Sequence, residues 1–223
     1  GYRNTLMYVV LGTGISMMIT IMGAFILSHR DLMLKRITMA LVVFTMYFSG
    51  GMIPTYLVVT QLKLTNSLWG FLLPGAVSVY NLIVLRTAFN SVPKALLESA
   101  EIDGAGDLTV LFRIVLPLST ASLATIGLFY AVTFWGSWYN ALVYLQKRRD
   151  LYPLQMILRE LLITDKTTDS MVTAYNGQAA NQYLLKEIVK YCAIVVSTLP
   201  ILAVYPFIQK YFVKGIMLGA IKE

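Results

Sequence analysis

The sequence predicts an all-α integral membrane protein, and three observations lead to that class. First, 57% of its 223 residues are hydrophobic and only 13% are charged, with a mean hydropathy of +0.69. Soluble domains usually carry about a quarter charged residues. Second, the charges are clustered, so that long uncharged windows separate them. Third, five windows reach or approach the ~20 apolar residues that a helix needs to cross ~30 Å of hydrocarbon. We therefore expect five transmembrane helices in one domain over residues 1–223.

Prolines and glycines within these windows indicate where the helices start, bend or break. Gly50, Gly51 and Pro54 should loosen or kink the second helix, and Pro74 lies near the start of the third. Pro117 suits the first turn of the fourth helix, where a missing N–H costs little. The expected spans are at about 5–28, 37–61, 67–90, 117–145 and 187–212.

Composition also excludes several functions. A single cysteine, Cys192, rules out an internal disulfide or a cysteine-based zinc site, and a single histidine, His29, rules out a multi-histidine metal site. The sequence contains no H-E-x-x-H, no G-x-S-x-G and no ATP-binding P-loop motif. We expect neither an enzyme nor a cofactor. In a membrane protein, the net charge of +7 is more typical of contact with anionic lipid headgroups than of nucleic-acid binding.

A charged island, residues 98–117, interrupts the apolar windows and belongs to a connecting loop, residues 91–116. Its charges and polar backbone cannot lie in hydrocarbon, so it must meet water at one face of the bilayer. Helical spacing from Pro93 onward groups Leu96, Leu97 and Ala100 on one stripe and Lys94, Glu98 and Glu101 on the opposite side.

The end of this first short helix is also predicted. Gly104 suits the position after the last turn, where a positive φ is needed, and Asp107 is expected to cap a second short helix over Leu108–Val115. Leu116 and Pro117 should then return the chain to the membrane. By periodicity alone, an interfacial amphipathic helix that merely connects two spans is the favoured interpretation of the island.

The longest polar segment, residues 147–186, lies between the fourth and fifth windows. Helical spacing over Leu151–Ile163 predicts an amphipathic surface helix at its start. If residues 98–117 are cytoplasmic, basic residues divide evenly between the two faces, and they favour this orientation once the long loop is left out.

The island resembles the cytoplasmic loop of the inner-membrane permeases of binding-protein-dependent ABC importers, whose signature is E-A-A, three residues, G, nine residues, I-x-L-P. Serine replaces the central alanine here, a change between small residues. The matching positions, with the two residues that flank the glycine, are Glu98, Ser99, Ala100, Asp103, Gly104, Ala105, Ile114, Leu116 and Pro117.

The resemblance extends beyond the loop. The C-terminal residues 205–222 and the segments 1–5 and 50–56 are similar to carbohydrate permeases of the maltose-importer (MalG) type, in particular to the branch with LplC-like and alginate-importer permeases. Relative to that family, the first helix is expected to be missing from this chain.

Membership of this family would imply a multi-pass permease subunit in a bacterial cytoplasmic membrane. Its partners would be a second permease subunit, two cytoplasmic ABC ATPases that hydrolyse ATP, an extracytoplasmic solute-binding protein and membrane lipid. Glu98 would be the charged contact with an ATPase and Gly104 the turn between the two coupling helices. Residues 147–186 would reach toward the binding protein.

Sugars are typically held by aromatic faces together with amides and hydroxyls. Candidate residues of the translocation path follow from this rule, although aromatic residues near a helix end also anchor helices at the membrane interface and asparagine also joins helices by hydrogen bonds. The candidates are Tyr80, Asn81, Trp135, Trp138, Tyr139 and Asn140.

The functional hypothesis is that of an ATP-driven importer subunit for an oligosaccharide, with acidic sugars included. One alternative is an ABC permease for another solute, such as an amino acid, a polyamine or an anion. The other is an ion-coupled secondary transporter, against which the uncharged windows argue because such carriers usually keep ionisable groups within their spans.

Overall fold

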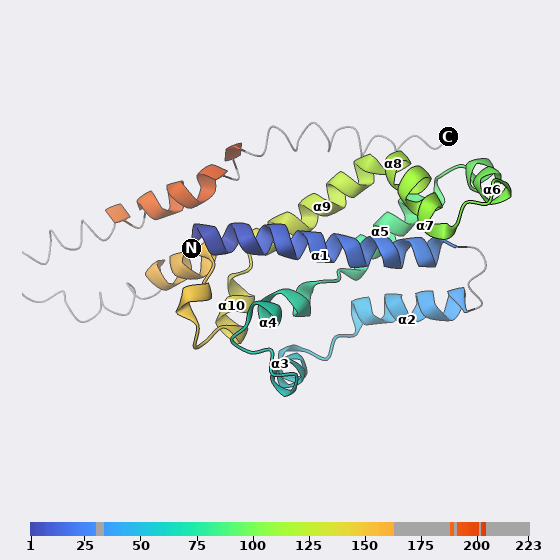
Figure 1. Cartoon of the computed structure of the whole chain (residues 1–223). Coiled ribbons are helices and arrows are strands. Elements are labelled where there is room, and N and C mark those ends of the chain that lie inside the picture. The colour runs from blue at the N-terminus through green and yellow to red at the C-terminus, as the bar shows by residue number, and fades with distance from the viewer. Residues whose placement is uncertain (30–33, 163–187, 190, 201, 204–223) are drawn as a thin grey trace, which may run out of the picture.

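The computed structural model describes residues 1–29, 34–162, 188–189, 191–200 and 202–203. In these ranges the chain forms helices and no strand, which confirms the all-α prediction for the described part (Figure 1). Further helical residues lie at 154–162 and 191–200. The named helices are α1 (Tyr2–Ser28), α2 (Lys35–Tyr47), α3 (Met52–Gln61), α4 (Leu68–Leu72), η1 (Leu73–Gly75), α5 (Val79–Asn90), α6 (Lys94–Ile102), α7 (Asp107–Val110), η2 (Leu111–Val115), α8 (Leu116–Leu118), α9 (Thr120–Trp135), α10 (Trp138–Tyr144) and η3 (Arg149–Leu151).

Helix α1 is the central element, and it packs along α9 and α5 (Figure 1). A stripe of small and polar side chains makes the close approach possible. At Gly12, an added Cβ would lie 2.7 Å from the Phe134 ring of α9. Small residues at helix–helix contacts are typical of membrane proteins, where apolar attraction between helices is weak. Buried members of the stripe recur every four residues: Tyr8, Gly12, Ser16, Thr20 and Ala24.

A buried tyrosine ties these three helices together. The Tyr130 hydroxyl of α9 accepts a hydrogen bond from the backbone N–H of Ser78 at 3.0 Å, just before α5, and lies 2.7 Å from the Thr20 hydroxyl of α1. Since its oxygen accepts from Ser78, its own proton is available for Thr20. No local sequence signal predicted this network, because its members are far apart in the chain.

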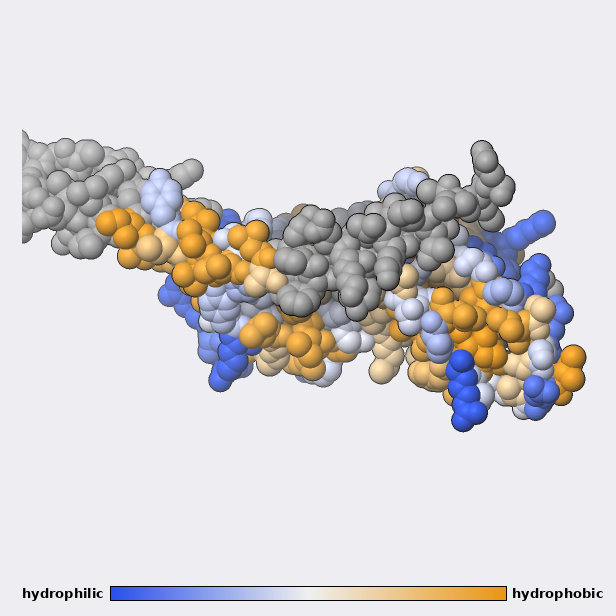
Figure 2. All heavy atoms as spheres, turned by 90° about the horizontal axis from the view of Figure 1, so that it is seen from above, coloured by the Kyte–Doolittle hydropathy of each residue, from blue (hydrophilic) through white to orange (hydrophobic). Residues whose placement is uncertain are grey.

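The outer surface of the described part is strongly apolar. Figure 2 shows orange hydrophobic side chains in two areas of the coloured part and blue hydrophilic ones toward both its left and right ends. On α2 and α3, Val59 is the one buried residue, whereas Ile53 is 67% exposed. One described helix, α1, is long and apolar enough to cross a membrane, and up to four spans result if each bent helix pair is counted as one.

The second predicted span is divided into α2 and α3, which meet at 110°. Gly51 lies at the break with φ +84°, a conformation that glycine adopts without strain. The sequence predicted a kink at Gly50 and Gly51, and the structure places a sharp corner there. The third predicted span is likewise divided, with a bend of 57° between η1 and α5.

The fourth predicted span starts later than expected. Pro117 does not open it but lies inside α8, in a helical run that begins at Asp107, and the chain turns by 86° at Ser119 before α9. The Ser119 N–H still bonds to the Val115 and Leu116 carbonyls at 3.1 Å, so the helical run continues past the proline. The fourth span also ends with a break, between α9 and α10. Of the fifth predicted span, 187–212, the structure describes residues 188–189, 191–200 and 202–203, and Tyr191–Pro200 is helical.

Candidate functional site

The 91–116 loop folds as α6, α7 and η2, and its first turn is a complete helix-terminating motif. The Gly104 N–H bonds to the Glu101 carbonyl at 3.0 Å, and the Ala105 N–H bonds to the Ala100 carbonyl at 2.9 Å. This is the hydrogen-bond pattern of a Schellman motif, which requires a left-handed residue at the position of Gly104. Gly104 has φ +79°, as the sequence predicted.

The second helix of the loop starts differently from the prediction. Asp107 is the first residue of α7 and not its cap, because the N-cap is Gly106 and no side chain caps the helix. A carboxylate in the first turn still stabilises a helix through the helix dipole. The turn from α6 to α7 therefore depends on the backbone geometry of the two glycines.

Small side chains dock the loop on the membrane part. Leu97, Ala100 and Ala105 are half-buried and pack against the apolar core. Ala100 and Ala105 belong to the motif, so two of its small residues lie at this contact. Leu96, predicted on the same stripe, is instead 45% exposed. The core residues near the loop are Phe25, Leu85, Phe89, Val110, Leu111 and Val115.

Large apolar side chains of the loop also face outward, and the sequence reasoning missed them. Ile102 is 86% exposed, and Leu108 and Phe112 are each 64% exposed. Of the remaining motif residues, Glu98, Ser99, Asp103 and Pro117 are exposed, while Ile114 and Leu116 are half-buried.

The C-terminal end of α1 meets the loop. Arg86 of α5 donates through Nε to the Leu27 carbonyl at 2.9 Å, and Lys35 of α2 donates through Nζ to the carbonyls of Ser28 and His29 at 3.2 and 2.8 Å. Cations at a helix C-terminus satisfy its free carbonyls and complement its dipole. His29 Nε2 also lies 3.8 Å from Asp107 Oδ1.

A cavity of about 610 Å³ separates part of α6 from this end of α1 and α5. Charged side chains of both signs line it, among them Lys35, Arg86, Lys94, Glu98 and Glu101. The predicted polar side of α6 thus faces a water-accessible space, in agreement with the expected solvent exposure of its carboxylates.

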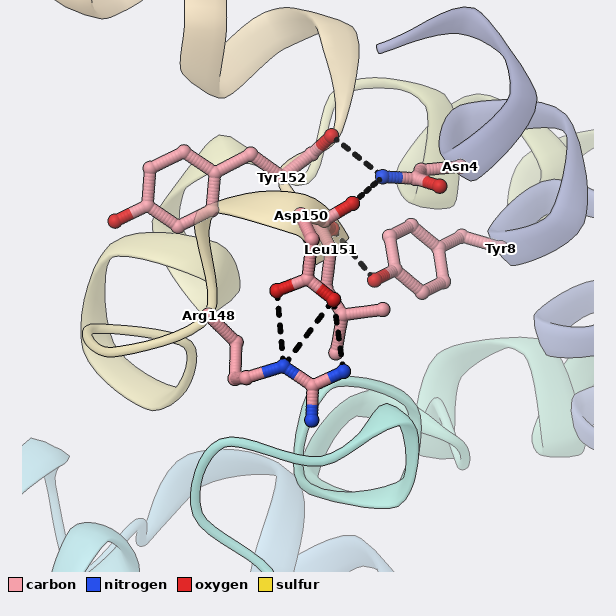
Figure 3. Close-up of polar contacts among 6 residues, drawn as sticks. All are labelled: Asn4, Tyr8, Arg148, Asp150, Leu151 and Tyr152. Atoms are coloured by element: carbon pink, nitrogen blue, oxygen red, sulfur yellow. Dashed lines mark hydrogen bonds and ion pairs between the residues drawn. The ribbon is translucent and has the colours of Figure 1, made fainter.

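At the opposite end of α1, polar side chains hold the start of the predicted outer loop (Figure 3). Asn4 donates through Nδ2 to the Asp150 and Tyr152 carbonyls at 2.6 and 3.1 Å, and the Tyr8 hydroxyl donates to the Leu151 carbonyl at 2.7 Å. We call residues 147–162 the outer segment. Its predicted amphipathic helix is present at 154–162, with Leu158 buried.

An exposed ion pair lies within the same part of the outer segment. Arg148 donates through Nε and Nη2 to the two carboxylate oxygens of Asp150 at 2.9 and 2.7 Å. These hydrogen bonds lower the pKa of the Asp150 carboxyl below its ordinary value. Arg149 pairs in the same way with Glu160 at 2.9 Å.

The candidate path residues fall into two groups. Asn81 is buried, at 5% exposure, and its N–H binds the capping Ser78 hydroxyl. Asn140 donates to the Phe71 carbonyl at 3.4 Å, and the indole N–H of Trp135 is buried without a hydrogen-bond partner in the described part of the chain. Asn81 is therefore placed in the packed interior, whereas Trp135 and Asn140 are half-buried.

The remaining candidates are accessible. Tyr80 is 55% exposed at the start of α5. Trp138 and Tyr139, 38% and 45% exposed, meet edge to face with ring centroids 5.8 Å apart, and the Tyr139 hydroxyl contacts the sulfur of Met52 in α3. Of the predicted set, the structure brings Trp138 and Tyr139 together as an exposed aromatic pair.

Comparison with known proteins gives consistent results. The model of a family described as "Binding-protein-dependent transport system inner membrane component" matches residues 15–145. The chain is 45% identical to the polygalacturonan/rhamnogalacturonan transport system permease protein YtcP of Bacillus subtilis, over 99% of this chain and 77% of that protein. It is 43% identical to the protein LplC of the same organism, over 96% of this chain and 70% of that protein.

A solved structure is also similar. It is a bacterial ABC transporter involved in the import of the acidic polysaccharide alginate, and one of its chains matches with a TM-score of 0.83 at 33% identity, over 95% of this chain and 74% of that chain. The family match covers the 91–116 loop and all helices from within α1 to α10. This chain therefore belongs to the family of inner-membrane components of binding-protein-dependent transport systems.

Proposed function

We propose that the chain is one of two permease subunits of an ATP-driven importer and forms half of the translocation path for an acidic oligosaccharide. A second, non-identical permease, two cytoplasmic ATPases and an extracytoplasmic solute-binding protein complete the assembly. The chain crosses the membrane five times, with the 91–116 loop in the cytoplasm and the outer segment on the opposite side.

The observation that carries this proposal is the geometry of the 91–116 loop. Backbone hydrogen bonds at Gly104 fix the turn between α6 and α7, and Leu97 and Ala100 of α6 pack against the apolar cluster next to the cavity. Ile102, Leu108 and Phe112 are exposed apolar side chains of the same loop, and the Glu98 side chain is exposed as well. Exposed apolar side chains next to a charge are typical of a protein–protein contact. We assign this surface to the ATPase.

The packing of the helices next to the loop supports a role in transmitting movement from the ATPase to the membrane-spanning helices. Since α1 packs along both α5 and α9, a displacement of the loop is passed to three helices that Tyr130 ties together. Rocking of packed helices as a body is a common way to alternate access to a central path. ATP hydrolysis in the partner would supply the energy, and Glu98 would be the charged contact with it.

The substrate class is proposed from the relatives. The 45% identical relative is named for polygalacturonan and rhamnogalacturonan transport, and the similar structure belongs to an alginate importer. All three names describe polysaccharides that contain uronic acids. We propose a short oligosaccharide with carboxylate groups as the transported solute.

Reconstitution tests the function. The chain is co-expressed with its candidate partner permease and ATPases, purified, and placed in proteoliposomes with the binding protein. We expect uptake of an oligogalacturonide that requires ATP and the binding protein. Uptake that proceeds without any ATPase would contradict the proposal and favour an ion-coupled carrier. Uptake of an amino acid or polyamine in place of the sugar would contradict the substrate class alone.

A further inference from the structure

Three side chains meet where α10 and the helix of the outer segment come together. Trp138 and Tyr139 are the first two residues of α10, and the guanidinium carbon of Arg159 lies 4.7 Å from the centre of the Trp138 ring. We call Trp138, Tyr139 and Arg159 the Arg159 cluster. It lies at the end of the molecule opposite α6 (Figure 1).

Arg159 differs from the neighbouring arginines in its partners. Arg148 binds Asp150 at 2.7 Å, and Arg149 binds Glu160 at 2.9 Å. Within the described residues, Arg159 makes the contact with Trp138 and neither a hydrogen bond nor an ion pair. Among the described residues, therefore, no partner occupies the N–H donors of the half-buried Arg159.

Contact with the Trp138 ring does not use these donors. A cation is attracted to the face of an aromatic ring, whereas a guanidinium binds a carboxylate through two N–H groups at its edge. The ring contact also restricts the side chain, so less rotamer entropy is lost when an anion binds. Arg159 is thus held in place with its preferred ligand missing from the described part of the protein.

The aromatic members of the cluster are suited to contact the pyranose ring that carries the carboxylate. Both rings are partly exposed, and they stand at 88° to each other, so they face different directions. An exposed aromatic face contacts the apolar C–H face of a pyranose ring, and nearby donors fix its orientation. The cluster therefore combines a carboxylate-binding edge with aromatic surface.

We propose that the Arg159 cluster is a subsite for one uronic acid residue at the outer mouth of the permease. Arg159 binds the carboxylate, and Tyr139 contacts the sugar ring beside it. This inference rests on the proposed function and deepens it, because it names the carboxylate as the group of the substrate that the permease itself binds.

The test uses the complete reconstituted importer with a short oligogalacturonide at saturating loaded binding protein, so that affinity of the binding protein does not limit the rate. Four proteins are compared: the unchanged chain, Arg159→Gln, Arg159→Lys and Arg149→Gln. Uptake and binding-protein-stimulated ATP hydrolysis are both measured. Arg149→Gln is the matched control, since it removes an exposed arginine of the same segment from a surface ion pair.

We expect Arg159→Gln to lower uptake about tenfold, in line with the loss of a charge-assisted hydrogen bond. Arg159→Lys keeps the charge but not the paired N–H groups, so its rate should lie between those of Arg159→Gln and the unchanged chain. Arg149→Gln should stay within about twofold, and ATP hydrolysis should be unchanged in all four. Full uptake by Arg159→Gln would overturn the subsite. So would an equal loss of uptake and ATP hydrolysis, which would assign Arg159 a structural role. If the unchanged chain takes up no oligogalacturonide, the proposed function itself fails.

Discussion

At the N-terminal end of α1, polar side chains bind the backbone of the outer segment, whereas at its C-terminal end apolar side chains carry much of the contact with the 91–116 loop. Asn4 and Tyr8 make side-chain hydrogen bonds of 2.6–3.1 Å to three successive carbonyls. Leu97, Ala100 and Ala105 instead pack against the core, next to a cavity of about 610 Å³.

The two attachments respond differently to displacement. A hydrogen bond is lost when its geometry changes by a small amount, and the buried groups are then left unsatisfied. Apolar contact is non-directional, so a small shift exchanges one contact for another. The outer segment is thus fixed to α1, and the loop at the other end can move against it. That difference is what an importer driven from the cytoplasmic side needs.

The largest effect is expected for Glu98→Lys. The substitution reverses the charge that we assign to the ATPase contact, and loss of one partner of a buried charge pair costs about 2–5 kcal/mol. We expect uptake to be abolished while the protein remains in the membrane fraction. Glu101→Lys is the matched control, because it reverses a neighbouring carboxylate outside the motif. Normal uptake with Glu98→Lys would exclude the docking role.

Asn4→Ala tests the attachment of the outer segment to the N-terminal end of α1. It removes two hydrogen bonds to carbonyls of the outer segment from a side chain that is 5% exposed. We expect a loss of stability of about 1–3 kcal/mol, measured by thermal unfolding in detergent, and faster proteolysis near residue 150. Thr133→Ala serves as control, since the exposed Thr133 hydroxyl bonds within its own helix. Equal unfolding temperatures for the two variants would contradict a fixed attachment.

Gly104→Ala probes the turn of the loop. An alanine at φ +79° costs about 1–2 kcal/mol, because its Cβ meets the following carbonyl in the left-handed region. We expect reduced uptake with a smaller loss than for Glu98→Lys. Gly106→Ala is the control: its φ of −73° suits any residue, and an added Cβ meets no atom within 4 Å. The account of the turn is wrong if both variants transport equally.

The sequence predicted the features that depend on local chemistry. Gly104 was identified as left-handed because few other residues adopt that conformation. The break near Gly51 was expected because glycines and the nearby Pro54 loosen or kink a helix. The loop motif was recognisable because its spacing repeats a turn between two short helices. These features involve residues within a few positions of one another.

Tertiary contacts account for what the sequence did not predict. Pro117 was placed at the start of the fourth span because a proline suits a first turn, but it lies in a helical run that begins at Asp107, and the bend follows it at Ser119. The bonds of Asn4 to the outer segment and the contact of Arg159 with Trp138 join distant parts of the chain, so no local pattern marks them. Asn81 was a path candidate because amides can hold sugars, and its 5% exposure could not be read from the sequence.

Photo-crosslinking from position 102 tests the central claim most directly. Ile102 is 86% exposed at the end of α6, so a photoreactive amino acid there does not disturb the core. In the assembled complex we predict crosslinks to the cytoplasmic ATPase, and none to it from the same probe at Tyr139. Crosslinks from position 102 to the extracytoplasmic binding protein, or none to any ATPase, would contradict the account.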